Sequence, residues 1–443
     1  MPASPARAAA FDILLRVERE SSYTSELLHS STYEKLSTPD HALATELVMG
    51  VLRWRSRLDS VIAQASSQSL KKLDLEVMIA LRLGVYQFGW LTRIPARAAL
   101  HESVELVRRA RKRSAAPFVN AVLRRLTNAP VPPVVKDLSP QTVAESCAHP
   151  LWMVKRWAEQ YSLKVAEKIC EHNQSVPQTT LRLRSPKAEA ELEAQGISLA
   201  PGKMLAPARR LVSGDVTKTE SFRTGRVVIQ DEASQLIASL IGSGHEQILD
   251  CCAAPGGKTL AVADQNPGAA ITAVEIHPHR ARLMRTLLRT DAQRIRIVTA
   301  DARHLPLKRT FDRILVDAPC SGTGTLARNP EIKWRLEPED LPELHERQLA
   351  ILRSAAERLK PGGSLIYSTC SLEKEENEDV VERFLKDDPR LRQRDCREEL
   401  AHLKATGVLN RPDPVSLTRG PNLRTIPGIH PCDGFFAAII ECR

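Results

Sequence analysis

The sequence predicts a multidomain chain: an all-α N-terminal domain, a small α+β domain, and an α/β domain of the Rossmann-like type. Apolar residues recur at helical spacing over 5–128, and prolines cluster over 128–140. From residue 230 an alternation of apolar strand, tight turn and helix repeats, which is typical of a parallel sheet covered on both faces. The expected boundaries are 1–130 for the helical domain, 131–148 for the linker, 149–229 for the α+β subdomain and 230–443 for the Rossmann-like domain.

The first domain carries most of the excess positive charge. The whole chain has a formal net charge of +10, and residues 1–130 hold 19 Lys and Arg against 12 Asp and Glu, a difference of +7. No acidic residue lies between Leu106 and Lys136. Seven basic residues crowd this stretch: Arg108, Arg109, Arg111, Lys112, Arg113, Arg124 and Arg125. This concentration favours a polyanion such as RNA, although a run of charge also fits a solvated helix face.

The linker and the middle of the chain follow. NAPVPPVVKDLSP places four prolines in 13 residues, which predicts a stiff connection. A helical stretch over 149–173 then gives way to the strand-like runs TTLRLRS and RRLVSGD around the helical KAEAELEAQ. We therefore expect a small α+β unit before residue 230.

The cysteines and the hydropathy pattern exclude several classes of protein. Nine cysteines occur with no Cys-x-x-Cys pair and no regular spacing, which argues against a disulfide framework or a zinc site. No segment approaches the roughly 20 apolar residues of a membrane span, and the start of the chain is too interrupted for a signal peptide. We expect a cytoplasmic, monomeric protein with reduced thiols, no metal and no membrane contact.

Acidic residues stand at the ends of successive strands in the last domain. ILDCCAAPGGKT leads from a strand through Asp250 to a glycine turn and a helix start. Glu275, Asp301 and Asp317 end the next three strands, and the carboxyl ends of parallel strands line one crevice where such sheets bind ligands. A P-loop is disfavoured because it requires glycine at the position of Cys252. The dinucleotide fingerprint Gly-x-Gly-x-x-Gly is also missing.

Two cysteines should overlook the same crevice: Cys320, after VDAP, and Cys370, after IYST. Taken singly, each fits a buried structural thiol. Together with the cofactor loop they suit one reaction, in which a thiolate adds to carbon 6 of cytosine so that carbon 5 can attack a methyl sulfonium. The methyl donor would be S-adenosylmethionine, and the target base would have to leave its stack. Asp317 is placed either to assist at ring nitrogen 3 or to contact the cofactor.

Five strings carry a resemblance to a known family. The family is that of the NOP/Sun RNA methyltransferases: DCCAAPGGKT resembles its cofactor loop, VDAPCSGTG its Pro-Cys motif and YSTCS its Thr-Cys motif. QDEASQL and HPCDGFFAA resemble two flanking motifs of the same family. RIPARAALHESVELVRR and KRSAAPFVNAVLRRL are similar to NusB, a helical RNA-binding fold. The combination resembles the RsmB (Sun or Fmu) family of 16S ribosomal RNA cytosine-5 methyltransferases.

The resemblance implies roles for individual residues. It makes Cys370 the covalent nucleophile and assigns to Cys320 the release of the methylated RNA. It places the following residues around S-adenosylmethionine: Cys252, Ala253, Ala254, Pro255, Gly256, Gly257, Lys258, Glu275, Asp301 and Asp317. Glu275 stands where many relatives have Asp, and QDEAS where QDAAS is common, and both changes largely preserve the chemistry.

The resemblance also implies 16S ribosomal RNA as substrate and partner. Two alternatives stay open at this point. The catalytic part alone also fits an enzyme that methylates transfer RNA or another RNA. A non-catalytic ribosome-assembly factor would keep the same fold only to bind RNA.

Overall fold

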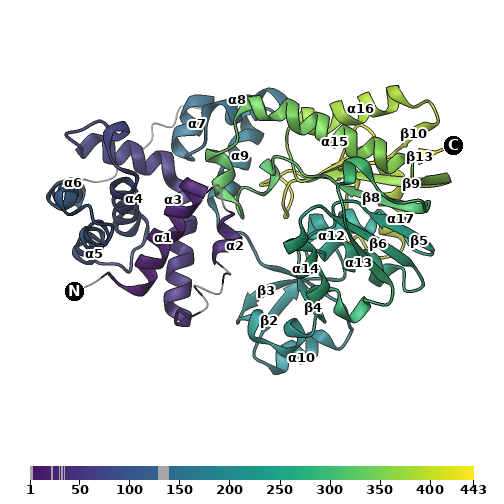
Figure 1. Cartoon of the computed structure of the whole chain (residues 1–443), viewed down its shortest axis with the longest axis horizontal. Coiled ribbons are helices and arrows are strands. Elements are labelled where there is room, and N and C mark those ends of the chain that lie inside the picture. Colours follow the sequence, from purple (N-terminus) through teal and green to yellow (C-terminus); the bar gives the residue numbers. More distant parts are fainter. Residues whose placement is uncertain (1–2, 21–22, 29, 31–32, 34, 128–138) are drawn as a thin grey trace. The chain divides into compact units, whose positions relative to one another are not determined.

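The computed structural model of the chain describes residues 3–20, 23–28, 30, 33, 35–127 and 139–443. It divides into two compact units (Figure 1). The first unit comprises residues 1–176 together with 326–336, and the second comprises 177–325 together with 337–443. Within the described residues, no helix combines the length and apolar character needed to cross a membrane.

The first unit is helical, as predicted. Its helices are α1 (Pro5–Glu20), α2 (Thr24–Leu28), α3 (Thr38–Ala65), α4 (Leu75–Trp90), α5 (Ala96–Arg109), α6 (Ala116–Thr127), α7 (Pro140–Ser146), α8 (Leu151–Tyr161) and α9 (Leu163–Gln174). Ser37 caps α3 by accepting a hydrogen bond from the Asp40 amide, 3.3 Å away. Apolar faces of α1 and α3 to α6 form one core around Phe11, Leu47 and Leu83.

The predicted linker and subdomain boundaries differ from this division. Residues 131–138 of the linker lie outside the described residues, and 140–146 form α7. Helices α8 and α9, which the sequence pattern groups with the α+β subdomain, lie in the first unit.

The chain also leaves the second unit after Thr325 and returns to it at Glu337. The intervening segment includes a 3₁₀ helix, η7 (Pro330–Trp334), and packs within the first unit. The buried ammonium of Lys333 donates to the carbonyls of Arg53 (2.8 Å) and Ala148 (2.9 Å). Burial lowers the pKa of Lys333 to about 7.

The second unit begins with the small α+β domain. Its antiparallel sheet has the order β2-β3-β1-β4. The elements are β1 (Thr180–Leu183), α10 (Ala188–Ala194), β2 (Ser198–Pro201), β3 (Ala208–Ser213), α11 (Glu220–Arg223) and β4 (Val227–Ile229). Leu181, Leu192 and Val227 lie in its small core, which confirms the expected α+β class.

The larger domain is built on a mixed sheet of the order β11-β12-β13-β9-β8-β5-β6-β7, with β10 paired to β13. Strands β9, β8, β5, β6 and β7 are parallel, and β13 runs antiparallel to β9. The strands are β5 (Gln247–Asp250), β6 (Ala270–Glu275), β7 (Ile295–Thr299), β8 (Phe311–Asp317), β9 (Leu359–Thr369), β10 (Leu391–Arg394), β11 (Thr418–Arg419), β12 (Asn422–Arg424) and β13 (Phe436–Cys442).

Helices cover both faces of this sheet, as the alternating pattern predicts. They are α12 (Glu232–Ser239), α13 (Gly257–Gln265), α14 (Pro278–Leu287), α15 (Leu341–Ala356), α16 (Glu378–Asp387) and α17 (Cys396–Ala405). In β8, Leu315 packs in the core that contains α12 and α13. Its neighbours Ile314 and Val316 pack in the opposite core, with α15 and α16. Because adjacent strand residues face opposite sides, β8 is buried on both.

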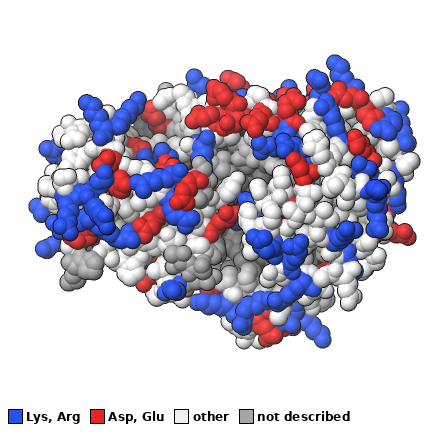
Figure 2. All heavy atoms as spheres, in the orientation of Figure 1, with Lys and Arg blue, Asp and Glu red and all other residues white. Residues whose placement is uncertain are grey.

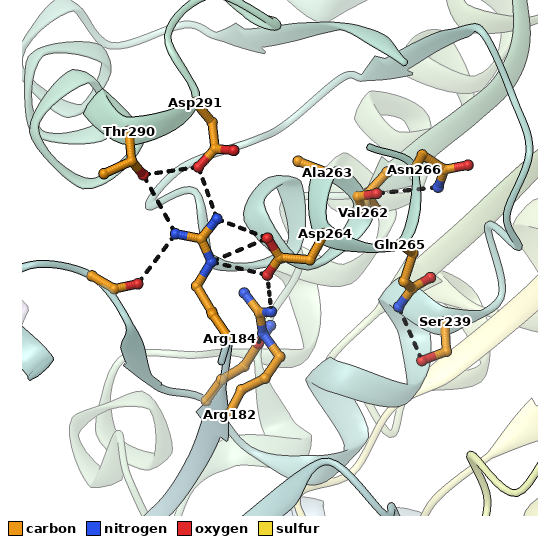
Figure 3. Close-up of polar contacts among 12 residues, drawn as sticks. Arg182, Arg184, Ser239, Val262, Ala263, Asp264, Gln265, Asn266, Thr290 and Asp291 are labelled. Atoms are coloured by element: carbon orange, nitrogen blue, oxygen red, sulfur yellow. Dashed lines mark hydrogen bonds and ion pairs between the residues drawn. The ribbon is translucent and has the colours of Figure 1, made fainter. Parts of the chain in front are cut away.

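An ion network joins the small domain to the helix that follows the glycine turn (Figure 3). Arg182 and Arg184, at β1, both donate to the carboxylate of Asp264 in α13, and the contact of Arg184 is 2.7 Å long. Arg184 also reaches Asp291 at 2.8 Å. The side chain of Arg182 is 8% exposed, so its charge depends on this partner.

We expect Asp264→Ala to destabilise the second unit by about 2–3 kcal/mol, because it leaves a buried arginine without its charge partner. All five tryptophans lie in the first unit. The denaturant concentration at the midpoint of unfolding should therefore fall when it is measured by circular dichroism, which also reports the second unit. The midpoint measured by tryptophan emission, which reports the first unit, should stay the same. Glu343→Ala, which removes an exposed partner of Arg347, should shift neither signal measurably. Equal midpoints for Asp264→Ala and the wild type would contradict a stabilising role.

Candidate active site

The glycine turn lies between β5 and α13. Gly256 has φ +107°, a left-handed conformation that favours glycine, and it directly precedes the first residue of α13. The free backbone N–H groups of a helix start attract anionic groups. Burial raises the pKa of the Cys252 thiol in this turn well above its ordinary value, so this cysteine stays neutral.

The predicted acidic residues lie where expected along the sheet. Asp250 ends β5, Glu275 ends β6 and Asp317 ends β8, while Asp301 follows β7 by two residues. Burial raises the pKa of Asp250 to about 7, and the hydroxyl of Thr259 donates to this carboxyl at 2.7 Å. Asp250 therefore supports the first turn of α13.

Glu275 and Asp301 differ in the number of hydrogen bonds that their carboxylates already accept. The Oε1 atom of Glu275 accepts from the His277 amide at 2.8 Å. The carboxylate of Asp301 is engaged by Arg303 through contacts of 2.7 to 3.1 Å. The side-chain hydrogen bond from Arg303 lowers the pKa of Asp301. A ligand hydroxyl therefore competes with Arg303 for Asp301.

Asp317 and Lys258 form an ion pair at the centre of the sheet edge. The Lys258 ammonium donates to Asp317 Oδ2 at 2.8 Å, and the Ser368 hydroxyl donates to Oδ1 at 2.9 Å. Burial disfavours the charge of Lys258, but Asp317 outweighs it and raises the lysine pKa. The ammonium also lies 4.9 Å from the ring centroid of Phe435. Sequence patterns did not single out Ser368 or Phe435.

The two predicted cysteines meet. Cys320 Sγ, after β8, lies 3.4 Å from Cys370 Sγ, after β9, and both side chains are partly exposed. Cys320 is a high-pKa thiol, because contact with Cys370 and burial both disfavour its anion. Strands β8 and β9 are parallel neighbours, which explains how residues 50 positions apart come together.

Glycines hold the loop after Cys320 against the last flanking motif. The Gly324 amide donates to the Cys370 carbonyl, and the Gly434 amide donates to the Gly324 carbonyl, both at 2.8 Å. A Cβ at Gly324 would lie 2.1 Å from the Gly434 carbonyl oxygen. Only glycine permits this approach, so HPCDGFFAA supports the Pro-Cys loop directly.

The donor set of this edge fits S-adenosylmethionine. Carboxylates at successive strand ends suit ribose hydroxyls, and the start of α13 suits a carboxylate. Three family models match the chain: "16S rRNA methyltransferase RsmB/F" over residues 238–441, "NusB family" over 4–128, and "Methyltr_RsmF/B-like, ferredoxin-like domain" over 149–215.

Curated relatives match almost the whole chain. The probable ribosomal RNA small subunit methyltransferase B of Bacillus subtilis is 36% identical over 98% of both chains. The ribosomal RNA small subunit methyltransferase B of Vibrio cholerae is 32% identical over 98% of this chain and 97% of its own.

A solved structure shares the fold of about two thirds of the chain. The structure described as a methyltransferase homolog from Pyrococcus horikoshii covers 69% of this chain and 100% of its own, with 26% identity and a TM-score of 0.56. S-adenosylmethionine is therefore the cofactor of the larger domain. The chain belongs to the RsmB/F family of 16S rRNA methyltransferases.

Proposed function

We propose that the protein transfers a methyl group from S-adenosylmethionine to carbon 5 of a cytosine in 16S ribosomal RNA. The observation that carries the proposal is the contact between Cys320 and Cys370. Their Sγ atoms lie 3.4 Å apart at the sheet edge that also holds the Lys258–Asp317 ion pair. Transfer to a nitrogen or oxygen atom has no need of two thiols. Carbon 5 of cytosine requires a nucleophile at carbon 6 to become reactive.

The two sulfurs have different tasks. The Thr-Cys and Pro-Cys motifs support this division, because their resemblance to the NOP/Sun family implies that Cys370 adds to carbon 6 and that Cys320 acts on release. S-adenosylmethionine supplies an electrophilic methyl group when bound. After carbon 5 is methylated, a water molecule or another base accepts the carbon 5 proton, and the electron pair of that C–H bond forms the double bond between carbons 5 and 6. The bond between carbon 6 and Cys370 breaks at the same time, with its electron pair returning to sulfur. Cys320, beside this bond, assists the release.

Lys258 and Asp317 hold the ring. An ammonium and a carboxylate 2.8 Å apart offer a hydrogen-bond donor and an acceptor to the polar edge of a pyrimidine. Their orientation is fixed in advance by Ser368, so they can stabilise charge that develops on the ring when the thiolate adds. We place the methyl donor against residues 252–257, Glu275 and Asp301.

The N-terminal unit offers a surface for the RNA. A groove of about 1110 Å³ lies between α5 and α6 and is lined by Arg97, His101, Arg108, Arg113, Asn120 and Arg124, among others. Basic side chains gather over these helices in Figure 2. A groove with several cations and a single acidic residue, Glu105, suits a phosphate backbone.

Part of the basic segment is neutralised by acids from elsewhere in the unit. Arg109 is held by both carboxylate oxygens of Asp12, at 2.6 and 2.8 Å. Lys112 pairs with Asp74 at 2.9 Å. Arg109 also lines the groove, so we assign RNA contact to the other cations of the groove rather than to the whole basic segment.

Arg113→Ala combined with Arg124→Ala should weaken binding of 16S ribosomal RNA. The slope of the logarithm of the binding constant against the logarithm of the salt concentration should become less steep by about one for each phosphate-neutralising side chain removed. The double variant should therefore reduce this slope by about two. Filter binding over a range of salt concentrations measures this slope. Arg16→Ala combined with Arg19→Ala is the matched control, because these exposed arginines pair with Glu20 and Glu76. An unchanged slope in the groove variant would show that the groove does not contact the RNA.

Bisulfite sequencing tests the proposed reaction. Ribosomal RNA from cells with and without the gene is compared, and one cytosine of 16S ribosomal RNA should lose its protection when the gene is deleted. Complementation should restore it. Loss of protection in transfer RNA alone would assign a different substrate, and no change in any RNA would contradict cytosine-5 methylation.

A further inference from the structure

A buried carboxylate that the proposed reaction does not use lies between the two cysteine loops. Glu376, in the 3₁₀ helix η9 (Lys374–Glu376), is fully buried, with 0% of its surface exposed. Burial raises its pKa, although hydrogen bonds from its neighbours oppose this effect. Placing a carboxylate in such surroundings is costly unless its oxygens are well bonded, so the contacts that offset this cost indicate its purpose.

The contacts of Glu376 come from both cysteine loops. The Ser321 amide and the Gln348 side chain donate to Oε1, at 2.8 and 2.9 Å. The hydroxyls of Ser321 and Ser371 donate to Oε2, and the second of these contacts is 2.5 Å long. Ser321 directly follows Cys320, and Ser371 directly follows Cys370. One carboxylate therefore bonds to the residue next to each thiol.

Surrounding contacts make this bridge rigid. The Gln348 side chain also donates to the Pro319 carbonyl, at 3.0 Å, on the other side of Cys320. The Tyr367 hydroxyl donates to the Glu376 carbonyl at 2.6 Å. The two serine hydroxyls lie 3.0 Å from each other. Movement of either loop would break several hydrogen bonds at once.

We propose that Glu376 is a positioning residue that fixes the separation of the Cys320 and Cys370 thiols. The inference deepens the proposed function, on which its catalytic consequence rests. Two sulfurs that act in turn on one ring must reach it without a loop rearrangement, since displacements of about 1 Å can cost a hundredfold in rate. Glu376 couples the loops so that both thiols face the same point.

The chemistry of the bridge predicts which replacement is tolerated. Glutamine keeps one oxygen, which can still accept from the Ser321 amide and Gln348. Its amide nitrogen can donate to the serine hydroxyls, which rotate and also accept. Alanine leaves the buried donors without an acceptor. Glu376→Gln should therefore restore most of what Glu376→Ala loses.

Thiol cross-linking by diamide tests the spacing without requiring activity. The two thiols give up two electrons and two protons to diamide, which is reduced to the hydrazine, and a Cys320–Cys370 disulfide forms. Mass spectrometry after alkylation follows its formation. We expect Glu376→Ala to slow cross-linking at least tenfold and Glu376→Gln to stay within about threefold of the wild type. Glu382→Ala, which removes an exposed carboxylate from α16, should match the wild type.

Methylation kinetics give the second readout. The turnover number of Glu376→Ala should fall by about a hundredfold, while calorimetry gives a dissociation constant for S-adenosylmethionine within about twofold of the wild type. Wild-type cross-linking in a folded Glu376→Ala protein would overturn the proposal. If that variant does not fold, Ser321→Ala decides, with slowed cross-linking in support and wild-type cross-linking against. A wild type that cross-links but does not methylate would contradict the proposed function and leave the positioning role standing.

Discussion

Replacing Cys370 by alanine is expected to abolish methyl transfer, with a loss of turnover on the order of 10⁴-fold or more. Without the sulfur that adds to carbon 6, carbon 5 of cytosine stays too weakly nucleophilic to attack a sulfonium methyl. Binding should persist, because the cofactor loop and the α5–α6 groove keep all of their side chains. Transfer of a labelled methyl group to 16S ribosomal RNA measures the rate, and calorimetry measures the binding of S-adenosylmethionine.

Cys396→Ala is the control for this experiment, because Cys396 is a fully buried thiol that packs in the core of the same unit, at the start of α17. Its replacement should lower stability while leaving turnover per folded molecule nearly unchanged. Near-normal methylation by Cys370→Ala would remove the nucleophile assignment. If Cys320→Ala alone lost all turnover without forming an adduct, the order of the two thiols would have to be reversed.

Much of the catalytic domain follows from the sequence because its signals are local. Each strand is short and apolar, and the residue that ends it is polar, so Asp250, Glu275 and Asp317 reach one edge once the strands are parallel. The pairing of Cys320 with Cys370 follows in the same way, because β8 and β9 are neighbours in the sheet. The strand-end pattern therefore carries most of the site.

Other features depend on contacts that no local pattern records. Arg109 belongs to the basic segment, but Asp12 neutralises it from a helix 97 residues away. Residues 326–336 follow the Pro-Cys loop in sequence, yet the side chain of Lys333 is buried in the first unit. Asp301 lies two residues beyond the end of β7 rather than at it, and Arg303 already binds its carboxylate. The tertiary fold decides which charged side chains are paired and in which unit a side chain is buried.

Glu376 shows the same limit within the active site. It stands in a run of acidic residues, EKEENED, that reads as a solvated helix start. Burial among Ser321, Gln348 and Ser371 makes it a bridge instead. The signal that could have revealed it is its position, six residues after Cys370 in a domain where strand ends carry the chemistry. The six-residue spacing becomes informative only when the structure shows that the loops after Cys320 and Cys370 are in contact.

Cys320→Ala should trap the enzyme on its RNA. Addition by Cys370 and methyl transfer do not require Cys320 in the proposed sequence, so the methylated ring forms while its release slows. A protein–RNA adduct that survives denaturing electrophoresis should then accumulate, and it should require S-adenosylmethionine. The double variant Cys320→Ala with Cys370→Ala should form none, because the bond to carbon 6 cannot be made.

The adduct also separates the roles of the two sulfurs more sharply than loss of activity does. Both single variants should be inactive in steady-state assays, yet only one should be covalently bound to RNA, and digestion followed by mass spectrometry should locate the bond at Cys370. The 3.4 Å contact between the sulfurs is the reason we expect the removal of Cys320 to act on release, because this thiol would lie beside the bond that has to break. Normal turnover by Cys320→Ala would show that release needs no second thiol.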